Sequence, residues 1–179
     1  METFIILLRA VNVAGKNTIK MAELKSHLEK ANFHNVKTYI QSGNIILQSD
    51  LSAPDIILKV QQIISEQFGF SVHVFVLTTD SLQHILHNNP FQYGEEGNRI
   101  FITLLDKKPD SSDLDKLARI DISDEKYEIK DDVFYFYVPQ GMANSKLSNP
   151  FIEQKLKVVS TGRNLNTMLK LSELAYQLN

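Results

Sequence analysis

The sequence Thr38-Tyr39-Ile40-Gln41-Ser42-Gly43-Asn44 is a polar turn between two short apolar runs, residues 36–40 and residues 45–47. A hairpin turn requires little more than one residue, such as Gly or Asn, that accepts a left-handed backbone, so we expect Gly43 to have a positive φ. This turn also carries two side-chain amides and a hydroxyl. The surplus polar groups predict a site at the turn, formed by Gln41, Ser42, Gly43 and Asn44.

The apolar periodicity on both sides of the turn predicts a β-α-β-β-α-β order for the first half of the chain. Strands are predicted at residues 4–8, 36–40, 45–48 and 72–77, and helices at residues 21–32 and from the capping pair Ser52 and Asp55 to Gly69. This order is that of a ferredoxin-like unit, in which the first and third strands are neighbours. We therefore expect Arg9, after the first strand, to lie close to Asn44.

The same order recurs in the second half of the chain. A short helix is predicted with Thr79 or Asp80 as its N-cap. Strands are then predicted at residues 100–105, 126–129, 133–138 and 157–160, with one helix capped by Asp110 or Ser111 and others from residue 149 and from about residue 165. The predicted fold class is α+β, with two tandem ferredoxin-like βαββαβ units and a C-terminal helix. The predicted domains are residues 1–87, a linker at 88–98 that contains Gly94 and Glu95, and residues 99–179.

Composition limits the kinds of function. The 179 residues include 43% hydrophobic residues, enough for a sizeable core, and carry a net charge of −2, which gives no general attraction to nucleic acid or membranes. The chain has no cysteine, which excludes disulfides, thiolate catalysis and zinc–thiolate sites. No export signal or membrane-spanning run is evident, so a cytoplasmic location is predicted.

Charge is distributed unevenly along the chain. Residues 92–132 hold 12 acidic and seven basic residues, whereas residues 9–20 hold three basic residues and no acidic one, and residues 139–170 hold five basic residues and one acidic one. The two basic stretches are also rich in amides, a combination that favours anions. The expected ligand-binding residues are Arg9, Asn12, Lys16, Gln41, Ser42, Gly43, Asn44, Lys146, Arg163 and Asn164.

Two motifs permit more than one interpretation. Residues 10–17 resemble the phosphate-binding loop G-x-x-x-x-G-K-[ST] only in part, because Ala10 and Asn17 stand at two of its defining positions, so a looser anion site that uses Lys16 is the better hypothesis. Residues 161–167 lie at the start of the last predicted helix. There Arg163 would bind an anion at the helix start, or Thr161 or Asn164 would cap the helix while Arg163 lies in solvent.

Several motifs together resemble a known family. The run L-L-R-A-V-N-V-A-G-K-N at residues 7–17 is similar to L-L-R-G-I-N-V-G-G-K-N of the bacterial "domain of unknown function 1697" family. The likeness continues in M-A-E-L, T-Y-I-Q-S-G-N, N-P-F, S-K-L and T-G-R-N-L-N-T, at residues 21–24, 38–44, 89–91, 145–147 and 161–167. The resemblance implies two ferredoxin-like units and no established activity. Ala10 and Ala14 replace glycines of the motif, and Leu165 replaces an aromatic residue.

The leading hypothesis is a binding protein for an anionic or phosphate-bearing small ligand, such as a nucleotide, at a basic, amide-rich cleft. The alternatives are a small-molecule enzyme, for which no catalytic residues are identified, and a protein-interaction module without a ligand. No cofactor is expected. No metal is expected either, because His84 and His87 have no third ligand at a suitable spacing. Long nucleic acid and membrane partners are not expected, and a monomer is slightly favoured over an oligomer.

Overall fold

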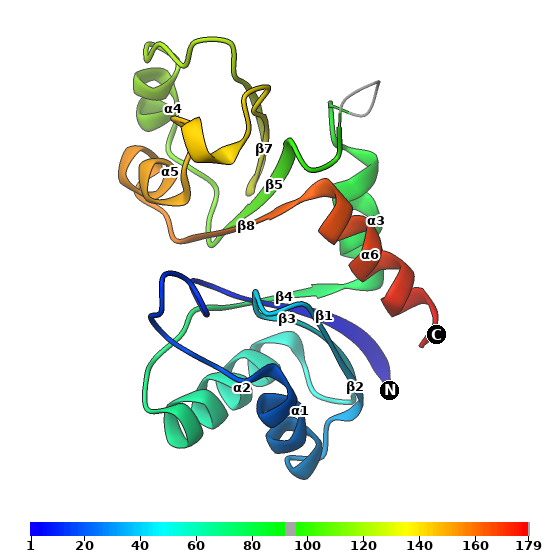
Figure 1. Ribbon diagram of the computed structural model, residues 1–179. Helices are drawn as coiled ribbons and strands as arrows, with labels where there is room; N and C mark the ends of the chain where they lie inside the picture. Colours follow the sequence, from blue (N-terminus) through cyan, green and yellow to red (C-terminus); the bar gives the residue numbers. More distant parts are fainter. Residues whose placement is uncertain (92–95, 179) are drawn as a thin grey trace. The chain divides into compact units, whose positions relative to one another are not determined.

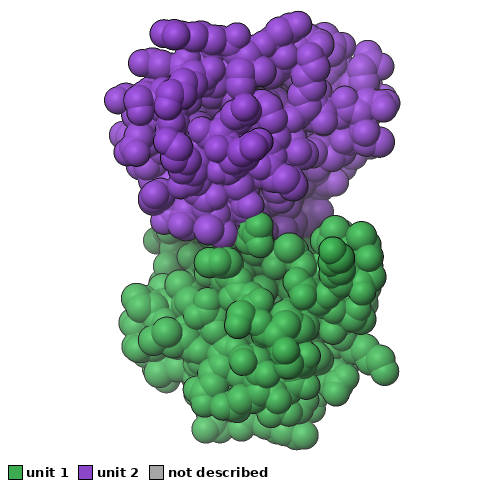
Figure 2. Space-filling view, turned by 90° about the vertical axis from the view of Figure 1, so that its left-hand side faces the viewer, with its two compact units in different colours: residues 1–84, 170–179 green, residues 85–169 purple. Residues whose placement is uncertain are grey.

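The computed structural model describes residues 1–91 and 96–178. The chain divides into two compact units, Met1–His84 with Lys170–Asn179 and Ile85–Leu169, which are coloured separately in Figure 2. The division falls within helices α3 (Thr79–His87) and α6 (Leu165–Tyr176). Residues 92–95 of the predicted linker, including Gly94 and Glu95, lie outside the described residues, and the predicted domain boundaries stay a prediction.

The first unit follows the predicted order of elements (Figure 1). It consists of β1 (Glu2–Leu8), α1 (Met21–Lys30), β2 (His34–Tyr39), β3 (Asn44–Ser49), α2 (Ala53–Phe68) and β4 (Val74–Thr78), followed by the first part of α3. The strands form one antiparallel sheet in the order β2-β3-β1-β4. Leu7 is opposite Asn44 in the pairing of β1 with β3, so the predicted proximity of Arg9 to the turn is confirmed.

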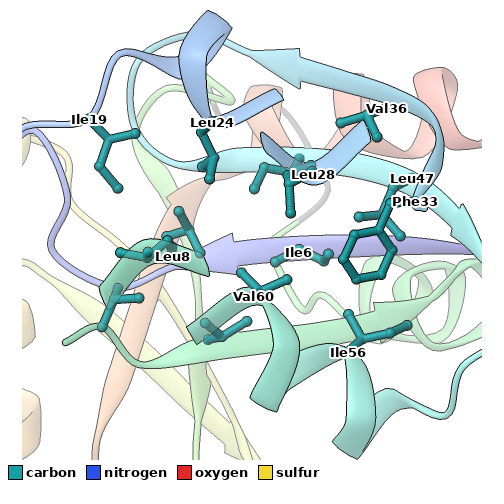
Figure 3. Packing of buried hydrophobic residues seen from close by; sticks show 14 of the residues in the cluster. Ile6, Leu8, Ile19, Leu24, Leu28, Phe33, Val36, Leu47, Ile56 and Val60 are labelled. Atoms are coloured by element: carbon teal, nitrogen blue, oxygen red, sulfur yellow. The ribbon is translucent and has the colours of Figure 1, made fainter. Parts of the chain in front are cut away.

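The core of the first unit lies between this sheet and helices α1 and α2, which cover one face of it (Figures 1 and 3). Alternate residues of β1, Ile6 and Leu8 among them, point toward the helices because side chains alternate along a strand. Residues at helical spacing on α1 and α2, such as Leu24 and Val60, meet them. The intervening residues of β1, including Ile5, are buried as well, which explains why residues 4–8 form an uninterrupted apolar run.

Local capping sets the ends of two helices. The Ser52 hydroxyl accepts a hydrogen bond from the Asp55 amide (3.3 Å), and Gly69 ends α2 at a φ of 80°, so both predicted caps of α2 are confirmed. The cap of α3 is Thr78, whose hydroxyl accepts from the Ser81 amide (3.1 Å). The predicted cap, Thr79 or Asp80, was therefore wrong, because strand β4 continues to Thr78 and the helix begins immediately after it.

The second unit has the same order of strands and helices. It contains β5 (Ile100–Leu105), α4 (Ser111–Leu117), β6 (Lys126–Lys130), β7 (Val133–Tyr137), the 3₁₀ turn η1 (Met142–Asn144), α5 (Asn149–Leu156) and β8 (Ser160–Asn164). These strands form an antiparallel sheet in the order β6-β7-β5-β8. The protein is thus α+β, with two four-stranded sheets and, over residues 1–91 and 96–178, six α-helices. None of these helices is long and apolar enough to cross a membrane.

The predicted strand at residues 157–160 is wrong. Lys157 has a φ of 53° and ends α5, and the strand that pairs with β5 comes later, at Ser160–Asn164. Its sequence, STGRN, has no apolar alternation, so its place in the sheet cannot be inferred from periodicity.

A buried carboxylate joins α4 to the end of α5. One oxygen of Asp113 accepts hydrogen bonds from the ammonium groups of Lys116 and Lys157, each at 3.1 Å. Only 2% of the Asp113 side chain is exposed, whereas both lysines are largely exposed. The hydrogen bonds from Lys157 and then Lys116 hold the pKa of the Asp113 carboxyl below its ordinary value.

We expect Asp113→Asn to be less stable than wild type at pH 7, because an ionised carboxylate with a lowered pKa favours the folded state. Its contribution is complete above the pKa of the unfolded chain, about 3.9, and is lost as the pH falls through the lower pKa of the folded state. Urea unfolding of both proteins at several pH values should show a difference at pH 7 that shrinks in acid.

Asp115→Asn, at an exposed position of the same helix, is the matched control and should differ little from wild type at either pH. A loss in Asp113→Asn that stays the same at low pH would show that the negative charge is not what stabilises this contact.

Candidate functional site

Two segments of the first unit meet at the side chain of Asn12. Its Nδ2 donates to the carbonyls of Gln41 (2.6 Å) and Ile19 (2.9 Å), and its Oδ1 accepts from the Ile19 amide (2.8 Å). Asn12 therefore connects the loop at residues 9–20 to the turn at residues 40–44, and we call these two segments together the loop cluster. Both amide protons of Asn12 are used in this way, so its role in the structure is to hold the cluster.

Gly43 lies where the turn approaches the end of β1. Its φ of 78° confirms the predicted left-handed backbone, and its carbonyl accepts from the Leu8 amide (2.9 Å). A Cβ atom at this position would be 2.5 Å from Val11 Cγ2 and 2.8 Å from Leu8 Cβ. Gly43 is thus required for its backbone conformation and also for its lack of a side chain.

Asn44 closes the turn from inside. Its side chain is fully buried, and Nδ2 donates to the Tyr39 carbonyl (3.1 Å) and to the Ser42 hydroxyl (2.9 Å). Ser42 is partly buried, and the side chain of Gln41 is exposed. The four predicted residues of the turn therefore have different roles, since Gly43 and Asn44 shape it while Gln41 and Ser42 reach its surface.

The loop at residues 9–20 is held in a tight conformation by residues with positive φ. Ala14 and Gly15 have φ values of 49° and 74° between Val13 and Lys16, whose amide donates to the Val13 carbonyl (3.0 Å). Two positive values at the centre of a turn are the pattern of type I′. Ala10 also has a positive φ, 55°. A positive φ is readily adopted by glycine and is unfavourable for alanine, so Ala10 and Ala14 have strained backbones.

The two segments of the loop cluster contain cationic side chains and no carboxylate. Residues 9–22 and 30–49 contain no Asp or Glu. Arg9 is partly buried, and Lys16 and Lys20 are exposed. Helix α1 begins at Met21, five residues after Lys16, so its N-terminus is too far along the chain to form the cradle of a phosphate-binding loop.

In the second unit, Lys146 makes hydrogen bonds to the acidic segment that contains Asp121 and Glu125. Its backbone amide donates to Glu125 Oε1 (2.9 Å), and its Nζ donates to the Asp121 carbonyl (3.0 Å). Asn164 accepts from the Thr167 amide at the start of α6 (2.9 Å), which confirms the capping interpretation for that residue. Both side chains therefore have a structural function in the second unit.

Arg163 lies on β8, opposite Ile102 of β5, and is only 9% exposed. The interpretation that placed it in solvent before a helix is wrong, because the polar run at residues 160–164 forms a strand. Its Nη1 donates to the Thr161 hydroxyl (2.9 Å) and to the Gly162 carbonyl (2.8 Å). Burial lowers the pKa of the Arg163 guanidinium to about 10, and the side chain stays charged at neutral pH.

Over the described part of the chain, no three His, Asp or Glu side chains come together as a metal site. The candidate residues with chemistry at the surface of the first unit are thus Arg9, Lys16, Gln41 and Ser42.

The family model described as "Protein of unknown function (DUF1697)" matches residues 1–135 of this chain. The chain belongs to the DUF1697 family. This match includes the whole loop cluster and confirms the resemblance inferred from the motifs, although the motifs at residues 145–147 and 161–167 lie beyond the matched range.

The fold has a solved counterpart. "The structure of conserved bacterial protein SP0830 from Streptococcus pneumoniae" is similar over 97% of this chain and 98% of that chain, with a TM-score of 0.76 and 22% sequence identity. At this identity the likeness shows that the fold is shared. A search of curated proteins finds no match.

Gly43→Ala should destabilise the protein by about 2–4 kcal/mol, because it combines an unfavourable positive φ with overpacking against Val11 and Leu8. Gly15→Ala is the matched control, since its φ of 74° is similar but a Cβ there meets nothing within 4 Å. It should cost about 1 kcal/mol, from the backbone alone. Equal losses in denaturant unfolding would show that the close approach of Gly43 to β1 has no energetic weight.

Proposed function

We propose that this DUF1697 protein binds a small anionic or phosphate-bearing ligand at the loop cluster of its first unit. The observation that carries the proposal is the absence of any carboxylate from residues 9–22, which supply Arg9, Lys16 and Lys20, and from residues 30–49, which contain the turn. Such a stretch has a positive local field although the whole chain has a net charge of −2.

The residues of the loop cluster fall into two groups, those that shape it and those that are exposed to a ligand. Asn12, Gly43 and Asn44 have their hydrogen bonds or their packing directed inward, and they fix the shape of the two segments. The side chain of Lys16 is exposed, and its ammonium makes no hydrogen bond or ion pair to any described residue, so the ammonium is available to a ligand. The exposed amide of Gln41 and the partly buried hydroxyl of Ser42 are further polar groups of the loop cluster.

The backbone supports the same ligand class. Successive residues with left-handed and right-handed φ direct their N–H groups to one side and form concave anion-binding nests. Residues 10–17 contain five positive φ values, at Ala10, Asn12, Ala14, Gly15 and Asn17. Because the net charge does not attract a long polyanion, the proposed ligands are of modest size, such as inorganic phosphate, a nucleotide or a sugar phosphate.

We also propose the finer fold class and location. In each unit two helices lie on one face of a sheet whose order is β2-β3-β1-β4 or β6-β7-β5-β8, the arrangement of a ferredoxin-like unit. The cytoplasmic location, the domain ranges and the participation of Lys146, Arg163 and Asn164 in ligand binding stay predictions. An enzyme that uses the same polar residues remains the alternative, since a fold of this kind hosts many functions.

A specific observation favours a second candidate, a protein-interaction module. Val13 and Ile40 are 59% and 52% exposed, and they flank the hydrogen bond between Asn12 and Gln41. Ile40 also has a φ of 50°, a conformation that costs a β-branched residue about 1–3 kcal/mol. An exposed, strained apolar side chain at the candidate site is a feature that contact with a partner would explain.

The test is a thermal-shift titration with inorganic phosphate, AMP and uncharged adenosine at low and moderate salt, in a buffer free of phosphate. We expect stabilisation of wild type by phosphate or AMP and none by adenosine. In Lys16→Ala the apparent affinity should fall about fivefold, the equivalent of ~1 kcal/mol for an exposed charge. Higher salt should weaken binding because it screens exposed charges.

Lys30→Ala is the matched control. Lys30 is an exposed lysine of the same unit at the far end of α1, about 14 Å along the helix from its first residue, so anion binding should be unchanged. Stabilisation by adenosine alone, or by anions to the same degree in Lys16→Ala and wild type, would contradict the proposed site. Stabilisation by none of the three compounds would favour the interaction module.

A further inference from the structure

A cavity lies within the first unit, away from the loop cluster in sequence. It is formed where α3 and the C-terminal half of α6 run beside each other (Figure 1) and has a volume of about 380 Å³. Pockets for small molecules have volumes of roughly 300–1,000 Å³, so this cavity is large enough for a compact organic ligand.

The two helices that form the cavity are joined by a side-chain hydrogen bond. Gln83 Nε2 on α3 donates to the Ser172 hydroxyl on α6 at 2.5 Å. Leu82 and Ala175, each 1% exposed, contribute an apolar surface, and Tyr176 is 79% exposed at the end of α6. The cavity thus has a hydrogen bond between its two helices, an apolar wall and an aromatic ring that is accessible to a ligand.

The described residues that line the cavity carry a single charge, which is negative. Asp80 is the one charged residue among its described lining residues, and it makes no ion pair with another described residue. Nε2 of Gln83 donates to Ser172, and the carbonyl oxygen of the same amide can accept a hydrogen bond from a ligand. The hydroxyl of Thr79 can accept as well. Such a lining suits a ligand that donates hydrogen bonds and carries positive charge.

We propose that this cavity binds a small organic cation, a primary ammonium group attached to a flat apolar body. The ammonium group pairs with Asp80 and donates to the oxygen of Gln83, while the apolar body packs against Leu82 and Ala175 and beside the ring of Tyr176. A cation near an aromatic face gains a further attraction from the ring. The site is independent of the anion site proposed above, and its ligand has the opposite charge.

The absence of tryptophan from the chain provides a direct assay. Tyr176→Trp keeps a flat ring at an exposed position and introduces the single indole fluorophore of the protein. The probes are phenethylamine, 2-phenylethanol and 3-phenylpropionate, which share a phenyl ring and differ in charge. We expect a saturable fluorescence change with phenethylamine at concentrations up to about 10 mM, the affinity expected of a ligand with so few atoms.

Adding Asp80→Asn to this reporter should weaken the binding of phenethylamine about tenfold or more, because it removes a charge-assisted hydrogen bond. Adding Glu23→Gln instead is the matched control, since Glu23 is an exposed acidic residue in the first turn of α1, and binding should not change. Urea unfolding of each variant establishes that it is folded.

Three results would overturn the proposal. One is the lack of a saturable change with phenethylamine in the folded Tyr176→Trp protein. Another is binding of the alcohol or the carboxylate as tightly as the amine, which would exclude a site for cations. The third is undiminished amine binding when Asp80→Asn is present, which would place the ligand away from that carboxylate.

Discussion

The structure of the first unit depends on the close approach of Gly43 to the end of β1, which leaves no space for a side chain. The turn brings its backbone so close to Leu8 and Val11 that no side chain fits, and the Gly43 carbonyl accepts from the Leu8 amide. This contact sets the register in which Leu7 is opposite Asn44, and a one-residue slip would exchange the two faces of β1. The face that carries Ile6 and Leu8 forms the core with α1 and α2, so the turn, the sheet and the core are specified together.

The same contact makes the loop cluster a defined surface. The chain leaves β1 beside the turn. The Asn12 side chain then donates to the carbonyls of Gln41 and Ile19 and accepts from the Ile19 amide. Positive φ values at Ala10 and Ala14 are unfavourable for alanine, and they persist because the surrounding hydrogen bonds fix the loop. A pre-formed loop loses little further conformational entropy when it binds a ligand, which is consistent with a binding site.

Much of the fold could be predicted from the sequence because its apolar residues recur with clear periods. The run at residues 4–8, the stripe that includes Val60 and the glycine that ends α2 each identified an element. Strand β8 was misplaced because STGRN is polar and its pairing with β5 is not a local property. Thr78 was missed as a cap because it also ends a strand.

The location of the candidate site could be predicted from the sequence, but the roles of its individual residues could be predicted less well. Sequence can place Asn12, Gln41 and Asn44 at turns, but it does not reveal which amides bond to the backbone and which reach solvent. The burial of Arg163 was missed for the same reason that β8 was misplaced. The cavity beside Asp80 gave no sequence signal, because Gln83 and Ser172 are 89 residues apart and no local motif links them.

The most direct measurement is an NMR titration of ¹⁵N-labelled protein with inorganic phosphate, for wild type and for Asn12→Ala. If the loop cluster is a pre-formed anion site, the largest amide shifts in wild type will lie within residues 9–20 and 40–44. Loss of the Asn12 bridge will then weaken binding about fivefold or more, while the amide signals of the paired strands β1 and β3 keep their native dispersion. Phosphate-induced shifts centred elsewhere, or unchanged affinity in the folded Asn12→Ala protein, would contradict an anion site held together by Asn12.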